Sequence, residues 1–221
     1  TMKWWDDLWL NEGLATWMAH KAMAATQPEL EPEILSVYST LKALEVDSLE
    51  GSRAPRSPVD DPASVVELFD AITNDKPAAV MAMTESLVGE KAMRRALREY
   101  LVSWSWGAAT TDDFLAAVEP KIGSAGAATI RDFVTRSGYP KIDVVSRCEG
   151  GRQRVKLTQR PVRESLRDAG PWTLPICVRL VGESAVNCAS LNSESVNLDI
   201  GACGSEVIVN PGIAGFYRAS Y

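Results

Sequence analysis

Residues Thr1 to Ala15 read TMKWWDDLWLNEGLA, and this stretch decides how the rest of the chain is interpreted. It combines tryptophans, acidic residues and a glycine. A helix is predicted to follow over residues 12–25, because apolar side chains recur there at helical spacing. Asn11 is the predicted N-cap of this helix. A glutamate such as Glu12 at a helix start often only complements the helix dipole, so its context must decide whether it does more.

The composition is ordinary for a globular protein, with 46% hydrophobic and 24% charged residues among 221. This length predicts one large or two modest domains. A net charge of -6 argues against nucleic acid or an anionic membrane as a partner, since both require a basic surface. No apolar run is long enough for a membrane span. Because the chain starts with Thr1 and shows no signal peptide, we expect a fragment of a longer protein whose location stays open.

Four cysteines lie in the last third of the chain, at positions 148, 177, 188 and 203. Their spacing matches no zinc motif. Two disulfides with three alternative pairings are compatible with the even count. We favour free thiols, because cysteine is among the residue types most often buried. The redox compartment is left open.

Helical patterns dominate as far as Gly138, and alternating patterns follow it. Helices are predicted over residues 12–25, 32–47, 63–72, 76–88, 90–103, 110–119 and 129–136. Strands are predicted over residues 141–147, 153–159, 172–181, 195–200, 206–209 and 216–221. The predicted fold is therefore α+β, with a helical part over residues 1–138 and a small antiparallel β-sandwich over residues 139–221.

The helix over residues 32–47 begins at a proline, which is well tolerated in the first turn. Its apolar side chains recur every three or four residues and predict the face that packs on the core. These side chains are Ile34, Val37, Tyr38, Leu41 and Leu44.

The opening stretch resembles a segment of the M1 family of zinc metallo-aminopeptidases, the gluzincins. In that family a WLNEG-type sequence follows the zinc-binding HExxH motif, and its glutamate completes the zinc site. Residues 9–13 match WLNEG fully, and residues 1–7 match the preceding part. The resemblance implies that Glu12 is the third zinc ligand. Asn11, Asp6 and Asp7 are then candidates for the shell of residues around that ligand.

The spacing of the family motif places both histidine ligands outside this chain. Eighteen residues separate the second histidine from the glutamate in the family, whereas eleven precede Glu12 here. One glutamate cannot hold zinc alone, because a catalytic zinc takes three protein ligands. His20 lies two helical turns beyond Glu12, about 12 Å along the axis, and is expected to be a surface or packing residue. We therefore expect zinc in the parent protein and none on this chain.

A second stretch, FDAITNDKPAAV over residues 69–80, resembles the family segment that carries a Tyr-x-Lys-Gly motif. The tyrosine of that motif donates a hydrogen bond to the oxyanion formed during peptide hydrolysis. Asn74 stands at its position, and Pro77 stands at the position of the glycine. Asparagine can donate a hydrogen bond but is shorter. Losing an oxyanion donor costs about two to three orders of magnitude in rate. A plain turn between two helices is the other interpretation of this stretch.

Later motifs extend the resemblance to nearly the whole chain. Residues 132–140 are similar to the junction at which the family's thermolysin-like catalytic domain gives way to a β-sandwich. Three further segments resemble strands of that sandwich, at residues 157–159, 172–176 and 210–218. The resemblance thus implies the C-terminal part of the catalytic domain followed by the sandwich.

Two functions remain in competition. The first is a fragment of an aminopeptidase that releases N-terminal residues from peptides and is inactive without HExxH. The second is a non-catalytic interaction or scaffold module derived from the same fold, which the asparagine at position 74 favours. For the isolated chain we also expect self-association, because Trp4, Trp5, Trp9 and Leu10 would form an exposed apolar patch.

Overall fold

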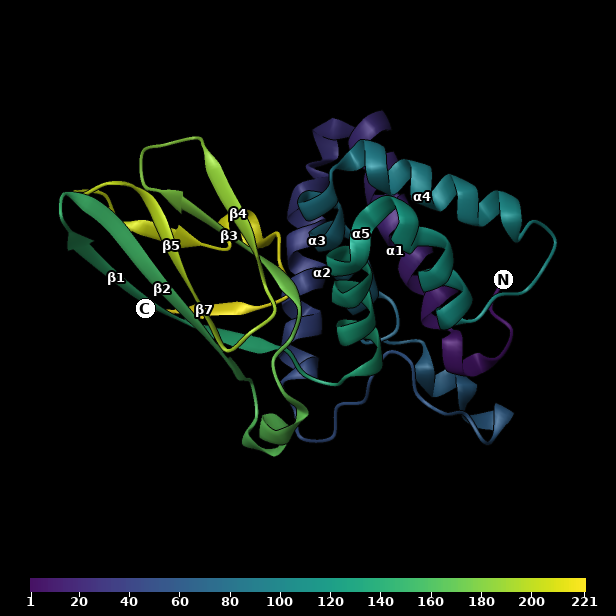
Figure 1. Ribbon diagram of the computed structural model, residues 1–221. Coiled ribbons are helices and arrows are strands. Elements are labelled where there is room, and N and C mark those ends of the chain that lie inside the picture. The colour runs from purple at the N-terminus through teal and green to yellow at the C-terminus, as the bar shows by residue number, and fades with distance from the viewer.

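Helices fill the N-terminal part of the chain and strands its C-terminal part, so that two blocks lie side by side in the computed structural model of residues 1–221 (Figure 1). The helices are α1 (Trp9–Thr26), α2 (Pro32–Asp47), α3 (Asp75–Val88), α4 (Glu90–Ser103) and α5 (Thr111–Thr135). None of them combines the length and the apolar character that crossing a membrane requires. The α+β class predicted from the sequence is confirmed.

The strands form two sheets that face each other as a small sandwich. They are β1 (Pro140–Glu149), β2 (Arg152–Pro161), β3 (Leu174–Leu180), β4 (Val186–Leu191), β5 (Ser195–Ala202), β6 (Val207–Val209) and β7 (Arg218–Ser220). The larger sheet has the order β5-β2-β1-β7 and the smaller one β4-β3-β6. Every pairing is antiparallel except that of β7 with β1, which is parallel.

Local sequence explains where the helices start and bend. Thr110 and Asp113 form a capping box at the start of α5, in which each side chain binds the other residue's backbone N–H. Gly89 separates α3 from α4 in a conformation with φ of 84°, which favours glycine. Helix α5 bends at Gly123, three residues after Pro120, because Gly123 is not helical. The two separate helices expected here are therefore joined across a kink.

Aromatic side chains join the helical block to the sandwich. Phe216, which precedes β7, makes edge-to-face contacts with Phe133 of α5 and with Tyr139 just before β1, at ring distances of 6.1 and 5.8 Å. The guanidinium of Arg136 lies 3.8 Å from the ring centre of Trp172. One connected hydrophobic core therefore runs from α1 through α3 and α5 into both sheets.

Three element predictions are wrong in detail. Helix α1 starts at Trp9, so Asn11 lies inside its first turn and does not cap it. Residues Pro62–Leu68 form a 3-10 helix in place of the expected helix over residues 63–72. Strand β4 was not predicted, because most of its side chains are exposed and give no alternating apolar pattern.

The buried face of α2 is also different from the predicted one. Of the five apolar residues expected to pack inward, only Leu44 is fully buried, next to Ala43 and Thr40. The side chains of Ile34, Tyr38 and Leu41 point to solvent. The helix packs through small residues on its other side, because α2 lies close to α1 and α3 there.

All four cysteines are paired, so the expectation of free thiols is wrong. Cys148 at the end of β1 bonds Cys203 just after β5, and Cys177 of β3 bonds Cys188 directly opposite it on β4. Each disulfide joins strands within one sheet. The free-thiol prediction failed because burial statistics cannot show which strands become neighbours.

The expected tryptophan patch exists only in part. Trp9 and Leu10 are buried, so their predicted exposure is wrong. Trp9 packs edge-to-face on Phe114 of α5, at 5.8 Å between ring centres. Trp4 is half exposed and donates a hydrogen bond to the carbonyl of Val59.

Candidate functional site

Glu12 lies in the first turn of α1, where the first turn of α3 comes very close. A Cβ atom added to Gly13 would be 2.5 Å from the Cβ of Pro77, a distance that real atoms do not reach. The glycine of the WLNEG sequence is therefore needed for close contact between two helices. This contact sets the position of the residues on either side, Glu12 on α1 and Asn74 just before α3.

Asn74 faces Glu12 across this contact. Its side-chain Nδ2 lies 3.5 Å from Glu12 Oε2, at the limit of a hydrogen bond. The other side-chain atom, Oδ1 of Asn74, is buried without a hydrogen-bond partner. The structure thus brings together two residues that are 62 positions apart and that the sequence singled out for the same site.

A turn centred on Asp70 fixes the backbone that carries Asn74. The Asp70 carboxylate accepts hydrogen bonds from the backbone N–H groups of Ile72 and Thr73, and it pairs with Arg53 at 2.9 Å. The backbone N–H of Asn74 donates to the carbonyl of Asp70. The turn expected between the two helical patterns is present, and it aims Asn74 at α1.

A buried ion pair anchors the same end of α3. Lys76 Nζ lies 2.8 Å from Asp47 Oδ2, and both side chains are completely buried. Lys76 also donates to the carbonyls of Arg136 and Gly138, and Asp47 accepts from the backbone N–H of Gly138. Burial lowers the pKa of Lys76, and the charge of Asp47 opposes that shift. The pair therefore joins α2, α3 and the junction with the sandwich.

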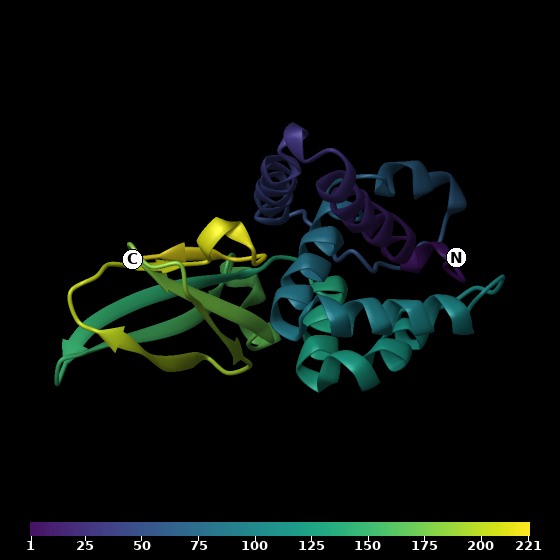
Figure 2. The same ribbon diagram turned by 90° about the horizontal axis from the view of Figure 1, so that it is seen from above.

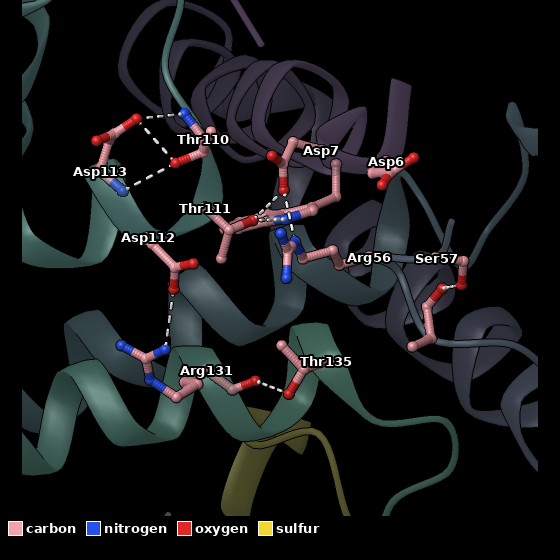
Figure 3. Close-up of polar contacts among 12 residues, drawn as sticks. Asp6, Asp7, Arg56, Ser57, Thr110, Thr111, Asp112, Asp113, Arg131 and Thr135 are labelled. Carbon is pink, nitrogen blue, oxygen red and sulfur yellow. Dashed lines mark hydrogen bonds and ion pairs between the residues drawn. The ribbon is translucent and has the colours of Figure 1, made fainter. Parts of the chain in front are cut away.

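Asp6 and Asp7 bind other parts of the chain. Asp7 is buried and accepts hydrogen bonds from Arg56 Nε at 2.9 Å and from the Thr111 hydroxyl at 2.5 Å (Figure 3). The same hydroxyl accepts from the indole N–H of Trp9. Asp6 accepts from the backbone N–H of Val59. These contacts tie the N-terminal segment to the loop before residue 60 and to α5, which accounts for both carboxylates structurally.

Asn11 and His20 lie away from the contact between Glu12 and Asn74. The Asn11 amide donates to the sulfur of Met2. His20 lines a separate groove of about 180 Å³ between α1, α2 and α3. Nearer the site, burial raises the pKa of Asp75 above its ordinary value, while the charges of Lys42 and His20 oppose the shift.

The residues of this chain do not make up a complete zinc site. Zinc in a catalytic site takes three protein ligands that converge within about 2 Å of the metal. Among residues 1–221 no group of three or more His, Cys, Asp or Glu side chains converges in that way. Glu12 is the one predicted zinc ligand that this chain contains. A zinc ion bound there would need its other ligands from elsewhere.

Sequence reasoning did not find the ion pair of Lys76 and Asp47. The residues themselves were visible, since Asp47 ended a predicted helix and Lys76 matched the lysine of the family segment. One signal was available. Lys76 is directly followed by eight uncharged residues, so a helix that is buried from its first turn would bury this charge too. A buried lysine needs an acidic partner.

Comparison with known proteins identifies the class of this helical and sandwich arrangement. The model of the peptidase family M1 domain matches residues 1–136, which is more than half of the chain. The chain therefore belongs to peptidase family M1.

Its curated relatives are much longer proteins. A probable aminopeptidase 1 from Sulfurisphaera tokodaii is 34% identical over the whole of this chain, which covers 28% of that protein. The leucyl aminopeptidase of Saccharolobus solfataricus is 30% identical over the whole chain and is covered to the same 28%. The tricorn protease-interacting factor F2 of Thermoplasma acidophilum is 30% identical and is covered to 27%. The chain thus spans little more than a quarter of these relatives.

Proposed function

We propose that this chain is part of a zinc-dependent aminopeptidase that releases N-terminal residues from peptides. The observation that carries the proposal is the position of Glu12. It lies in the first turn of α1, within the complete WLNEG sequence, at a helix contact that Gly13 makes possible. Two of the three relatives reported above are named as aminopeptidases, which supports the same class. In this proposal residues 1–138 belong to the catalytic domain and residues 139–221 form the sandwich domain.

In the complete protein Glu12 would be the third zinc ligand, with the two histidines of HExxH supplied by a segment outside this chain. The chain alone offers one carboxylate where three ligands are needed. We therefore expect the isolated chain neither to bind zinc tightly nor to cleave peptides. Asp6 and Asp7 would support Glu12 indirectly, because they hold the segment that leads into α1.

Asn74 would occupy the place from which a phenol hydroxyl serves the oxyanion in the family. Its amide instead points at Glu12, at 3.5 Å. The asparagine side chain is shorter than that of tyrosine and its Nδ2 lies beside the ligand carboxylate, and a missing oxyanion donor costs about two to three orders of magnitude in rate. We therefore expect slow peptide hydrolysis even when the zinc site is complete.

The contact between Asn74 and Glu12 also favours the second candidate function, a non-catalytic module derived from the peptidase fold. In such a module Glu12 would keep its place as a packing and hydrogen-bonding residue at the start of α1. Peptide or protein binding without cleavage would then be its activity.

The reading frame upstream of Thr1 distinguishes the two candidates first. The aminopeptidase requires an HExxH motif whose second histidine lies eight positions before Thr1. If that motif is present, the longer protein should contain one zinc and hydrolyse an aminoacyl-anilide. Glu12→Gln should remove both the zinc and the hydrolysis. Glu33→Gln, at an exposed position on α2, should leave the zinc content and the hydrolysis unchanged. If the motif is absent, or if the longer protein contains zinc after Glu12→Gln, the proposed role of Glu12 fails.

The fragment alone provides the second test. Dialysis against zinc followed by metal analysis should leave far less than one zinc per chain. A stoichiometric zinc that disappears in Glu12→Ala would contradict the expectation that the chain is incomplete. The natural fragment and its Glu12→Ala variant should also not differ in hydrolysis of the anilide, since neither should hydrolyse it.

A further inference from the structure

Helix α2 presents an apolar stripe that no part of the chain covers. Ile34, Tyr38 and Leu41 follow one another at helical spacing and are 60%, 67% and 40% exposed, and Leu35 beside them is 44% exposed. Side chains at spacings of three and four residues form one continuous row on a helix. Contiguous exposed apolar patches mark interaction sites, whereas apolar residues exposed singly are normal.

The apolar stripe of α2 is bracketed by negative charge. Glu31 directly precedes α2, Glu45 lies one turn after Leu41 on the helix, and both are exposed. Residues 29–45 contain four glutamates and one lysine, and none of these five side chains forms an ion pair within the chain. A partner for this helix should therefore offer an apolar channel with a positive rim.

Such a channel exists on the same molecule, between α1 and α4. It has a volume of about 490 Å³. Its apolar lining comes from both helices and consists of Leu14, Ala15, Trp17, Met18, Leu97, Tyr100, Leu101 and Val102. Leu101 and Val102 are 63% and 68% exposed, so the channel is open along α4. Apolar grooves between two helices are the usual receptor for the apolar face of a third helix.

The rim of the channel carries unpaired positive charge. Arg94 and Arg98 lie one turn apart on α4 and line the channel, and neither forms an ion pair or a hydrogen bond within the chain. Lys21, the third cation of the rim, is neutralised by Glu85 at 2.7 Å. Glu90 also lines the channel, so its three cations and two anions leave a net charge of +1. Two arginines are therefore available for carboxylates on an incoming helix, as the glutamates of α2 would supply.

We propose that α2 of one copy of this chain docks into the channel between α1 and α4 of a second copy. The apolar row would fill the channel, and the flanking glutamates would face Arg94 and Arg98. The lengths agree, since α2 with 16 residues is about 24 Å long and α4 with 14 residues about 21 Å. Charge complementarity decides in favour of this occupant, because a second α4 at the channel would bring arginines together.

Helices α2 and α4 lie on different sides of the helical block (Figure 2), so one contact between two copies leaves a free stripe at one end and a free channel at the other. The association is therefore heterologous, with copies joined head to tail. The proposal does not depend on zinc or on catalysis. Because Trp9 is buried, the stripe and the channel take the place of the tryptophan patch as the reason to expect self-association.

Two single variants and their mixture test this arrangement by analytical ultracentrifugation over a concentration series. The natural chain should form dimers and larger species. Tyr38→Glu should block the stripe and Leu101→Glu should block the channel, each weakening association by roughly 30-fold or more, as for a residue central to an interface. An equimolar mixture should form dimers and nothing larger, because it contains one working stripe and one working channel per pair. Both positions are exposed, and circular dichroism should confirm that the variants fold.

Charge reversal supplies an independent check. Arg94→Glu together with Arg98→Glu should abolish association, and Glu31→Lys together with Glu45→Lys in the other partner should restore it in the mixture. Arg95→Glu, on the exposed side of α4 away from the channel, should have little effect. A monomeric natural chain, association that survives both single variants, or a mixture that stays monomeric would each overturn the proposal. A longer parent protein that is monomeric while the fragment associates would show instead that another part of the parent occupies these surfaces.

Discussion

Lys76 and Asp47 form an ion pair of 2.8 Å in which neither side chain has any exposure to solvent. The pair sits where α2 ends, α3 begins and the chain crosses into the sandwich. Asp47 accepts the backbone N–H of Gly138, and Lys76 donates to the carbonyls of Arg136 and Gly138. The two charges thus satisfy backbone groups of the junction as well as each other.

Replacing Lys76 by methionine should destabilise the protein by about 3–5 kcal/mol, because it leaves the Asp47 carboxylate buried without a counter-charge. Urea unfolding followed by tryptophan fluorescence would measure the change. Lys42→Met is the matched control, since Lys42 is exposed and unpaired, and it should change the free energy of unfolding by about 0.5 kcal/mol or less. The double variant Lys76→Met with Asp47→Leu should cost less than the sum of the two single variants. Additive costs would contradict a direct interaction.

Gly13→Ala should destabilise the protein by about 1–3 kcal/mol through overpacking, although alanine is the better helix former. The new Cβ would be 2.5 Å from the Cβ of Pro77 and would push α1 and α3 apart. Gly51→Ala is the control, because a Cβ there meets no atom within 4 Å. Adding Pro77→Gly should recover part of the loss. A Gly13→Ala protein as stable as the natural chain would show that this contact is looser than the structure has it.

The sequence predicted most of the helices and strands and assigned Glu12 and Asn74 to one site, since both rest on local patterns and on motif resemblance. It did not predict which side of α2 is buried. The apolar row through Ile34 and Tyr38 has the correct period for a core face, but burial is decided by which neighbours the helix has. Helix α2 packs through Ala43 and Thr40 because small residues permit close approach to α1 and α3.

Long-range pairing was likewise invisible in the sequence. The bond between Cys148 and Cys203 forms because β5, β2 and β1 are successive strands of the larger sheet. The chain reaches β5 from β4, which belongs to the smaller sheet, so this neighbourhood does not follow from the order of strands in the sequence. The second bond lies between β3 and β4, and β4 has too few apolar residues to be recognised as a strand. The role of Asp7 also depends on Arg56 and Thr111, which are distant in sequence.

Removing the disulfides should destabilise the sandwich unequally. In the chain-entropy model the bond between Cys148 and Cys203, which are 55 residues apart, contributes about 4 kcal/mol. The bond between Cys177 and Cys188, which are 11 residues apart, contributes about 3 kcal/mol. Paired alanine variants compared by urea unfolding without reductant would measure both values. Thiol titration of the unfolded natural chain should find no free thiol before reduction, and four reactive thiols would contradict the pairing.

Asp7→Ala and Asp112→Ala compare a buried carboxylate with an exposed one in the same region (Figure 3). Asp7→Ala should cost about 2 kcal/mol or more, because the Thr111 hydroxyl loses its charged partner inside the protein and Arg56 loses its counter-ion. Asp112 pairs with Arg131 at the surface, where both side chains are more than half exposed. Its replacement should therefore cost about 0–1 kcal/mol. Equal effects of the two variants on the thermal midpoint would contradict this ranking.

Asp113 should make the stability of α5 depend on pH on the acid side. Its carboxylate accepts hydrogen bonds from the backbone N–H and the hydroxyl of Thr110, which lower its pKa below the ordinary value of 3.8. A carboxylate whose pKa is lower in the folded state stabilises that state above pH 3.8, and the contribution is lost as the pH falls through the folded pKa. The midpoint temperature of thermal unfolding should therefore fall more steeply below pH 3.8 for the natural chain than for the Asp113→Asn variant. The neighbouring Asp112→Asn variant should keep the steep fall, and a carboxyl resonance of Asp113 that titrates at or above 3.8 in NMR would refute the capping contribution.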